Sequence, residues 1–134
     1  MRRRALYVDS SALVKLVRTE AETDALAGFL AGRTLAASTV ARVEVLRAVR
    51  RAGGSEAEAQ RAEQVLATLY LVPPDDGILD QASRLGPSSL RTLDALHLAT
   101  ALALTAELDA FVAYDAALLE AAQAAGLETA SPGP

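Results

Sequence analysis

The sequence predicts an α/β protein with an open, mostly parallel sheet of four to five short strands flanked by helices. Short apolar runs of strand length recur along the chain, and longer stretches with helical periodicity separate them. Strands that alternate with helices in this way pair in parallel and are covered by helices on both faces. At 134 residues, the chain is long enough to bury one core and is expected to form one domain.

In the first half of the chain, apolar runs predict strands and periodic alanine-rich stretches predict helices. The expected elements are a strand over 5–8, helices over 11–17 and 20–30, a strand over 34–37, and helices over 40–51 and 55–69. Ser10 or Ser11 can cap the first of these helices. Gly32 ends the helix before the second strand. Ser55, with Glu58 three residues later, matches a capping box at the start of the last helix.

The second half of the chain continues the alternation. The expected elements are strands over 70–72, 111–113 and 127–129, and helices over 75–85, 90–106 and 115–125. Pro73 and Pro74 stop the third strand because proline cannot donate to the sheet. Gly126 ends the last helix. No repeat, linker or low-complexity segment divides the chain, so residues 1–130 are expected to form a single domain and 131–134 a mobile tail.

The composition excludes several kinds of site. Without cysteine, the chain can form no disulfide, thiolate nucleophile or cysteine-held zinc site, and its single histidine excludes a multi-histidine metal site. The basic start of the chain lacks the long apolar segment of a signal peptide. No stretch approaches the roughly 20 apolar residues that span a bilayer. We therefore expect a cytoplasmic protein with no membrane association.

The net charge of −4 is unevenly distributed. Residues 1–51 carry ten Lys or Arg and five Asp or Glu, whereas residues 52–134 carry three Arg and twelve acidic residues. Four acidic residues in apolar surroundings account for the whole excess of negative charge. A bound divalent cation would cancel much of their field, so the overall charge does not exclude a phosphate-rich partner.

These four acidic residues are the most informative feature of the chain. Asp9 and Asp115 each follow directly on a short apolar run, and Glu44 and Asp94 lie within apolar helical segments. A carboxylate in such surroundings costs free energy unless it is paired or holds a metal. If the fold brings the four together, they form an oxygen-ligand site for a hard cation. Taken singly, Asp9 and Asp115 can also be explained as helix N-caps.

The two acids within helices have ion pairs as their alternative explanation. Glu44 can pair with Arg47, although the neighbouring positions on its helix face are largely apolar, and Asp94 can pair with Arg91 three residues before it. His97 shares a helix face with Asp94. A lone histidine on an apolar helix is more often a hydrogen-bonding residue than a metal ligand, and we interpret it in that way.

Taken together, the four acids and their settings resemble the PIN-domain ribonucleases, specifically the VapC-type toxins of type II toxin–antitoxin systems. The resemblance covers essentially the whole chain in order. It is carried by the segments over 7–13, 38–44, 91–99 and 112–115, of which the third is the most specific.

This resemblance implies a metal-dependent endoribonuclease that hydrolyses RNA phosphodiester bonds with Mg²⁺, or Mn²⁺ as a substitute. Asp9 and Asp94 would be the main metal ligands, Glu44 would bind through water or act as a base, and Asp115 would support the shell or a second metal. The arginines of the 40–51 helix are candidates for contacting RNA. They are Arg42, Arg47, Arg50 and Arg51.

The resemblance also implies partners. We expect a homodimer and a cognate VapB-type antitoxin. The antitoxin is expected to pack on the helices over 11–31, through an apolar stripe that can in part belong to the core instead. The stripe consists of Leu13, Val14, Val17, Leu26 and Phe29.

One position departs from the family pattern. The family often has threonine two residues before the fourth acid, where this chain has Ala113, so Asp115 lacks a hydroxyl neighbour. Two other enzyme classes fit less well. A haloacid-dehalogenase-type phosphatase needs a second aspartate where this chain has Ser11, and a receiver domain needs a late lysine, whereas the only lysine is Lys15. The remaining alternative is a catalytically silent PIN-like module that binds RNA or protein.

Overall fold

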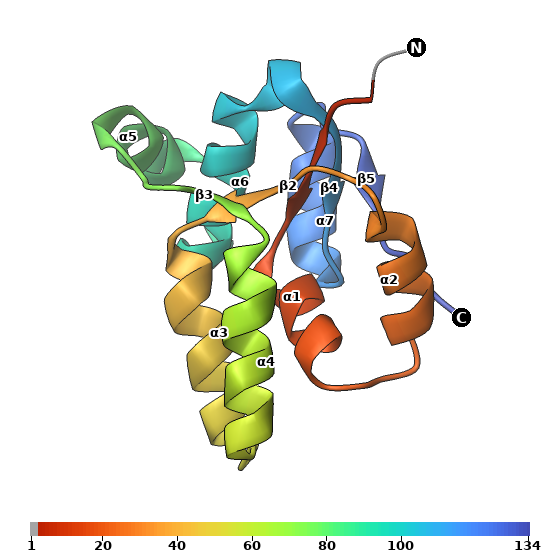
Figure 1. Cartoon of the computed structure of the whole chain (residues 1–134). Coiled ribbons are helices and arrows are strands. Elements are labelled where there is room, and N and C mark those ends of the chain that lie inside the picture. The colour runs from red at the N-terminus through yellow and green to blue at the C-terminus, as the bar shows by residue number, and fades with distance from the viewer. Residues whose placement is uncertain (1–2) are drawn as a thin grey trace.

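Five parallel strands form one sheet between two layers of helices in the computed structural model, which describes residues 3–134 (Figure 1). The strands are β1 (Ala5–Val8), β2 (Leu35–Ser38), β3 (Tyr70–Val72), β4 (Leu108–Val112) and β5 (Thr129–Ala130). Their order across the sheet is β3-β2-β1-β4-β5, and every neighbouring pair is parallel. The predicted α/β class and mostly parallel sheet are therefore confirmed.

The helices lie close to their predicted positions. They are α1 (Ser10–Val17), α2 (Thr23–Leu30), α3 (Val40–Arg51), α4 (Glu56–Ala67), α5 (Asp76–Arg84), α6 (Thr92–Ala103) and α7 (Ala116–Ala124), with a 3-10 turn η1 at Thr105–Glu107. Two helix ends differ by three residues: α2 begins at Thr23 instead of the predicted 20, and α6 ends at Ala103 instead of the predicted 106. The end of α6 has a visible cause. There the backbone tightens into η1, and the Glu107 N–H donates to the carbonyl of Leu104 at 2.8 Å. Strand β4 consequently begins three residues earlier than predicted.

Side-chain alternation in β1 divides the core between the two faces of the sheet. Leu6 and Val8 point to one face and pack with α1 to α4, whereas Tyr7 points to the other face and packs with α6 and α7. All three side chains are buried. Tyr7 stacks on Phe111 of β4 with ring centroids 5.2 Å apart. A central strand buried on both faces is typical of an all-parallel sheet.

Aspartates cap two helices that follow strands, and at α1 the cap is Asp9 rather than the predicted Ser10 or Ser11. Asp9 caps α1 by accepting a hydrogen bond from the Ala12 N–H, and Asp115 caps α7 in the same way. The alternative explanation of both residues as N-caps is therefore correct, but it engages only one oxygen of each carboxylate for this purpose. At the start of α4, the predicted capping box of Ser55 and Glu58 is confirmed.

The strand order places a topological switch point at the centre of the sheet. The chain proceeds from β1 outwards through β2 to β3, and then returns to the opposite side of β1 as β4. Val8 pairs with Val112, so β1 and β4 end side by side, and the Asp9 N–H donates to the Val112 carbonyl at 3.1 Å. Ligands of open α/β sheets bind beyond the carboxyl ends of the strands at such a point.

The end of the chain contacts the carboxyl end of β4. The Ser131 hydroxyl donates to the Ala113 carbonyl at 2.7 Å, and the Tyr114 hydroxyl donates to the Pro132 carbonyl at 2.5 Å. These bonds attach Ser131 and Pro132, in the tail predicted to be mobile, to the end of β4. The domain boundary at residue 130 and the mobility of 131–134 stay predictions. None of the helices within residues 3–134 has the length and apolar character needed to cross a membrane.

The antitoxin stripe predicted on the first two helices is largely core. Leu13, Val17 and Leu26 are buried against the sheet, so for these three residues the stated alternative of a core position is correct. Val14 is partly buried and Phe29 is exposed, and these two remain at the surface.

Replacing two glycines by alanine is predicted to change stability in opposite directions. A Cβ at Gly54 would lie 2.5 Å from Val49 Cγ1 and 2.8 Å from the Val49 carbonyl oxygen, and Val49 is itself buried. A Cβ at Gly28, inside α2, would meet no heavy atom within 4 Å. We expect Gly54→Ala to lower the free energy of unfolding by about 1–3 kcal/mol through overpacking. Gly28→Ala should raise it by about 0.5–1 kcal/mol through helix propensity. Urea denaturation measures both, and effects of the same sign would contradict the packing described for Gly54.

Candidate active site

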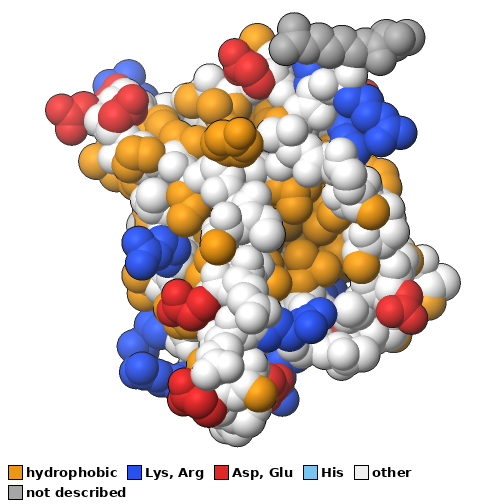
Figure 2. Space-filling model, viewed as in Figure 1, with side chains coloured by type: hydrophobic (Ala, Val, Ile, Leu, Met, Phe, Trp, Pro, Cys, Tyr) orange, Lys and Arg blue, Asp and Glu red, His pale blue; other side chains and the backbone are white. Residues whose placement is uncertain are grey.

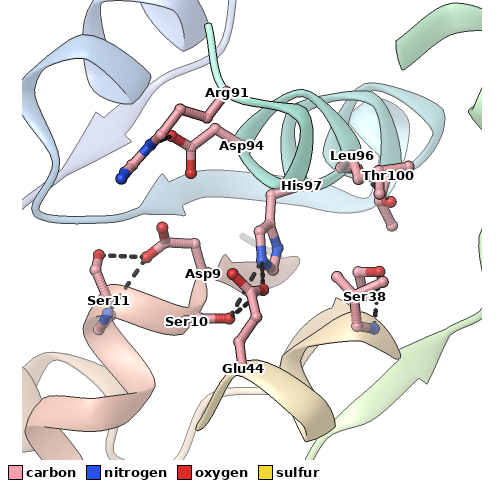
Figure 3. A network of polar contacts seen from close by, with 12 residues as sticks. Asp9, Ser10, Ser11, Ser38, Glu44, Arg91, Asp94, Leu96, His97 and Thr100 are labelled. Carbon is pink, nitrogen blue, oxygen red and sulfur yellow. Dashed lines mark hydrogen bonds and ion pairs between the residues drawn. The ribbon is translucent and has the colours of Figure 1, made fainter. Parts of the chain in front are cut away.

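The structure brings the four predicted acids to one edge of the sheet. Asp9 follows β1 and Asp115 follows β4, while Glu44 lies in the second turn of α3 and Asp94 in the first turn of α6. Three of these carboxylates therefore lie at helix N-termini, where the helix dipole favours the ionised form. Figure 3 shows Asp9 between Asp94 and Glu44, with the three side chains converging from different elements.

Asp9 is the most buried of the four acids, with 3% of its surface exposed. Its Oδ1 accepts hydrogen bonds from the Ser11 hydroxyl at 2.6 Å and from the Ala12 N–H at 3.3 Å. Among the described residues no donor contacts Oδ2. Burial raises the pKa of the Asp9 carboxyl, and these hydrogen bonds only partly oppose it. Ionised Asp9 therefore weakens the metal-free fold at neutral pH, and a cation beside it would offset that cost.

Glu44 is held through one oxygen by two side chains. The Ser10 hydroxyl donates to its Oε1 at 2.8 Å, and His97 Nε2 lies 2.6 Å from the same oxygen. Burial, the largest single influence, raises the pKa of Glu44, but the contacts with His97 and Ser10 outweigh it and hold the pKa below its ordinary value. Glu44 is therefore ionised at neutral pH, and no protein donor within the described part of the chain contacts its Oε2.

His97 belongs to a buried chain of polar groups that begins inside the sheet. Only 1% of its surface is exposed, and its Nδ1 lies 2.7 Å from the Tyr7 hydroxyl. The Tyr7 oxygen also accepts the Ser38 N–H at 3.1 Å. Because the Tyr7 oxygen accepts from Ser38, its own O–H donates to His97 Nδ1. The ring proton of His97 is then on Nε2, which donates to Glu44. Both ring nitrogens are thus in use, and the interpretation of His97 as a hydrogen-bonding residue is confirmed.

Arg91 bridges the two remaining acids. Its Nε lies 3.1 Å from Asp94 Oδ2 and its Nη2 lies 3.3 Å from Asp115 Oδ2. The predicted alternative, a pair between Arg91 and Asp94, is therefore real. The Arg91 side chain is 75% exposed, so this pairing is weak and can open readily. Of the two acids, Asp115 has both oxygens in hydrogen bonds, because its Oδ1 also accepts from the Leu118 N–H at 2.9 Å.

Two further expectations, for Glu44 and for Ser11, are decided by hydrogen bonds within the site. No ion pair forms between Glu44 and Arg47 in residues 3–134, because Glu44 turns towards Ser10 and His97. Ser11 does not cap α1 but orients Asp9. Its hydroxyl accepts a hydrogen bond from the Tyr114 N–H at 3.1 Å and donates one to Asp9 Oδ1 at 2.6 Å.

The sequence interpretation missed Tyr7 and the bridging role of Arg91. Tyr7 was assigned only to an apolar strand, yet a tyrosine buried in a central strand needs a partner for its hydroxyl. That requirement, together with the spacing of Asp94 and His97 on one helix face, was the available signal. For Arg91 the local pair with Asp94 was visible, but its contact with Asp115 depends on the tertiary fold.

The donor set fits a divalent cation such as Mg²⁺. Asp9, Glu44 and Asp94 each use one oxygen for bonds to protein groups and keep the other clear of protein donors in the described range. Within residues 3–134, no three acidic or histidine side chains are already arranged as a metal-binding group. Mg²⁺ does not require such a cage, since it keeps several waters and binds proteins through one or two carboxylates.

Comparison with known proteins places this geometry in a family. The PIN domain profile matches residues 6–124. Ribonuclease VapC47 of Mycobacterium tuberculosis is 41% identical over 133 residues, and the match covers 96% of this chain and 97% of the relative. Ribonuclease VapC46 of the same species is 43% identical over 129 residues, covering 96% and 98%. The chain therefore belongs to the PIN domain family and, within it, to the VapC group, as its sequence predicts.

Solved structures show the same fold. VapC20 of Mycobacterium tuberculosis, a toxin that cleaves the sarcin–ricin loop, superposes with a TM-score of 0.72 at 18% identity. That match covers 96% of this chain and 100% of VapC20. VapBC2 from Rickettsia felis, bound to a DNA fragment from its promoter, gives a TM-score of 0.70 at 14% identity, with 94% and 97% covered.

The buried polar chain predicts an unequal response to removing two tyrosine hydroxyls. Tyr7→Phe leaves His97 Nδ1 and the Ser38 N–H without a partner in a closed core, and should lower the free energy of unfolding by about 1–3 kcal/mol. Tyr70→Phe is the matched control because Tyr70 is 71% exposed, and it should change stability by less than about 0.5 kcal/mol. Denaturant titrations of both variants test this. Equal effects would show that the Tyr7 hydroxyl is not needed to complete the network.

Proposed function

We propose that this protein is a divalent-metal-dependent endoribonuclease that hydrolyses RNA phosphodiester bonds, and that it acts as the toxin of a toxin–antitoxin pair. The observation that carries the proposal is the convergence of Asp9, Glu44 and Asp94 at the switch point, each with one oxygen held by the protein and the other clear. Family membership, including relatives named as ribonucleases, supports the substrate class.

The side chains divide the work in this proposal. Asp9 and Asp94 would hold Mg²⁺, or Mn²⁺ in its place, through their clear oxygens. Such a cation would supply an activated water and neutralise charge on the phosphate. Glu44, ionised and oriented by Ser10 and His97, is placed to accept a proton from the attacking water through Oε2. Arg91 is exposed enough to leave Asp94 and contact the phosphate when RNA binds.

Partners and location follow from family membership and remain part of the proposal. We expect a VapB-type antitoxin to neutralise the protein, a homodimer in solution, and a cytoplasmic location. Val14 and Phe29, the members of the predicted stripe that reach the surface, are the starting points for mapping antitoxin contact. Co-purification of this chain with the product of a neighbouring small gene tests the antitoxin assignment.

The central prediction is that RNA cleavage depends on both the metal and the carboxylates. Purified protein should cut single-stranded RNA with Mg²⁺, and excess EDTA should stop it reversibly. Asp94→Asn should reduce the rate by at least about 100-fold, since it removes a charged ligand but keeps the helical fold. Asp76→Asn, which removes an acid from the first turn of α5, is the control. Cleavage that survives EDTA, or an undiminished rate in Asp94→Asn, would contradict the metal assignment. A wild-type protein that binds RNA without cutting it would instead establish the silent module.

Asp115 is predicted to contribute less than Asp94. Both of its oxygens already accept hydrogen bonds, from Leu118 and Arg91, and Ala113 offers no hydroxyl to orient it. Asp115→Asn keeps the cap on α7, so its loss of activity should be smaller than that of Asp94→Asn and should recover in part at high Mg²⁺ or with Mn²⁺. Metal titrations of both variants decide this. If the two are equally inactive at every metal concentration, Asp115 is a full metal ligand.

A further inference from the structure

A groove beside the carboxylates has chemistry that the cleavage reaction itself does not use. It has a volume of about 410 Å³ and lies between α1 and α3, with one residue of α6 at its mouth. Glu44 and Ser10 form its catalytic end, and Val14 and Ala48 line its walls. Anything that occupies this groove therefore lies directly against the site at which RNA is proposed to be cut.

Two arginines extend from the catalytic end along one side of the groove. Arg47 and Arg51 lie three and seven residues after Glu44, on the same face of α3, and both line the groove. Both are exposed. The negative end of the helix dipole favours a basic residue in the last turn and can therefore explain Arg51. It cannot explain Arg47, which lies in the middle of the helix.

The arginines of α3 also differ from most others in the chain by lacking acidic partners. Across residues 3–134, no carboxylate lies within ion-pair distance of an α3 arginine. Other arginines do have acidic partners, namely Arg4, Arg18, Arg33, Arg84 and Arg91. In a chain with net charge −4, uncompensated positive charge on one helix is a surface suited to a polyanion.

The mouth of the groove is apolar and exposed. Val43 and Leu93 have 61% and 44% of their surface exposed, and they immediately precede Glu44 and Asp94 in the sequence. Both line the same groove as the arginines. An apolar edge of this kind, next to guanidinium groups, suits the face of an unstacked base and accepts it without reading its sequence.

We propose that single-stranded RNA enters the site along this groove. Arg47 and Arg51 each hold a backbone phosphate next to the scissile bond, and the base of the neighbouring nucleotide lies against Val43 and Leu93. This inference rests on the proposed ribonuclease function and adds to it the path of the substrate. RNA is favoured over a segment of the antitoxin as the occupant, because Arg47 and Arg51 line the groove directly beside Glu44 at its catalytic end.

The test is RNA binding measured separately from cleavage. Fluorescence anisotropy of a labelled single-stranded RNA is recorded in Mg²⁺ across a salt series, with Asp94→Asn as the background so that the RNA stays intact. Adding Arg47→Ala or Arg51→Ala should weaken binding by about 3–10-fold. Each should also reduce the slope of log affinity against log salt by about 0.7, the value for one lost phosphate contact on a single strand.

Arg50→Ala is the matched control. It removes the same charge from the same helix, but Arg50 lines a different hollow, between α3 and α4. Its slope should stay that of the background. The double change Val43→Ala, Leu93→Ala should weaken binding without altering the slope, since it removes apolar contact and no charge. In the cleaving protein, Arg47→Ala should raise KM and leave kcat nearly unchanged.

Three outcomes would overturn the inference. Arg50→Ala could lower the affinity and slope as much as Arg47→Ala, which would indicate general attraction only. The groove variants could bind RNA as the background does. They could also lose capture of the co-expressed antitoxin while keeping RNA binding, which would assign the groove to protein. Because binding is measured without cleavage, failure of the proposed nuclease activity and failure of the groove are distinguishable.

Discussion

The site depends on the different roles of the two oxygens in each carboxylate. In Asp9, Glu44 and Asp94, one oxygen accepts bonds from protein groups and the other faces the shared space without a protein donor in the described range. The held oxygen fixes the direction of the side chain, and the other stays available to a cation. Partners of this kind commonly change metal affinity or activity by about 10–100-fold. Asp115, with both oxygens engaged, shows the opposite condition.

Two elements supply most of this arrangement. Strand β1 ends at Val8, directly before Asp9, and carries Tyr7 on the opposite face from Leu6 and Val8. Helix α6 carries Asp94 and His97 one turn apart. The bond between Tyr7 and His97 therefore ties the strand to the helix and, through His97, to Glu44 on α3. A change in the position of any one element would disturb acids on the other two, so the core and the site are coupled.

Much of this arrangement could be predicted from the sequence, because its strongest signals are local. An aspartate after a short apolar run marks the end of a buried strand, and parallel strands place such ends at one edge of the sheet. Asp9 and Asp115 followed this rule. Asp94 and Glu44 were recognisable because ionised groups on apolar helix faces need a reason to be there.

The contacts that complete the site were not visible locally. Ser10 bonds to Glu44, 34 residues away, and Tyr7 bonds to His97, 90 residues away. Either serine after Asp9 could have capped α1 or oriented an acid, and only the tertiary fold assigns Ser11 to Asp9 and Ser10 to Glu44. The early end of α6 was also missed for a non-local reason. Alanine and leucine continue the helical pattern in the sequence, but the tertiary fold requires the chain to turn into β4 before that pattern ends.

Locating a bound metal is the most direct test of the carboxylate site. Crystals soaked in Mn²⁺ and measured for anomalous scattering reveal the ion independently of activity. We expect one principal peak beside Asp9 Oδ2 and Asp94 Oδ1, with Glu44 still bonded to Ser10 and His97, and no such peak in Asp9→Asn crystals. A peak elsewhere on the surface, or none at this edge of the sheet at millimolar Mn²⁺, would contradict the assignment of these carboxylates to a metal site.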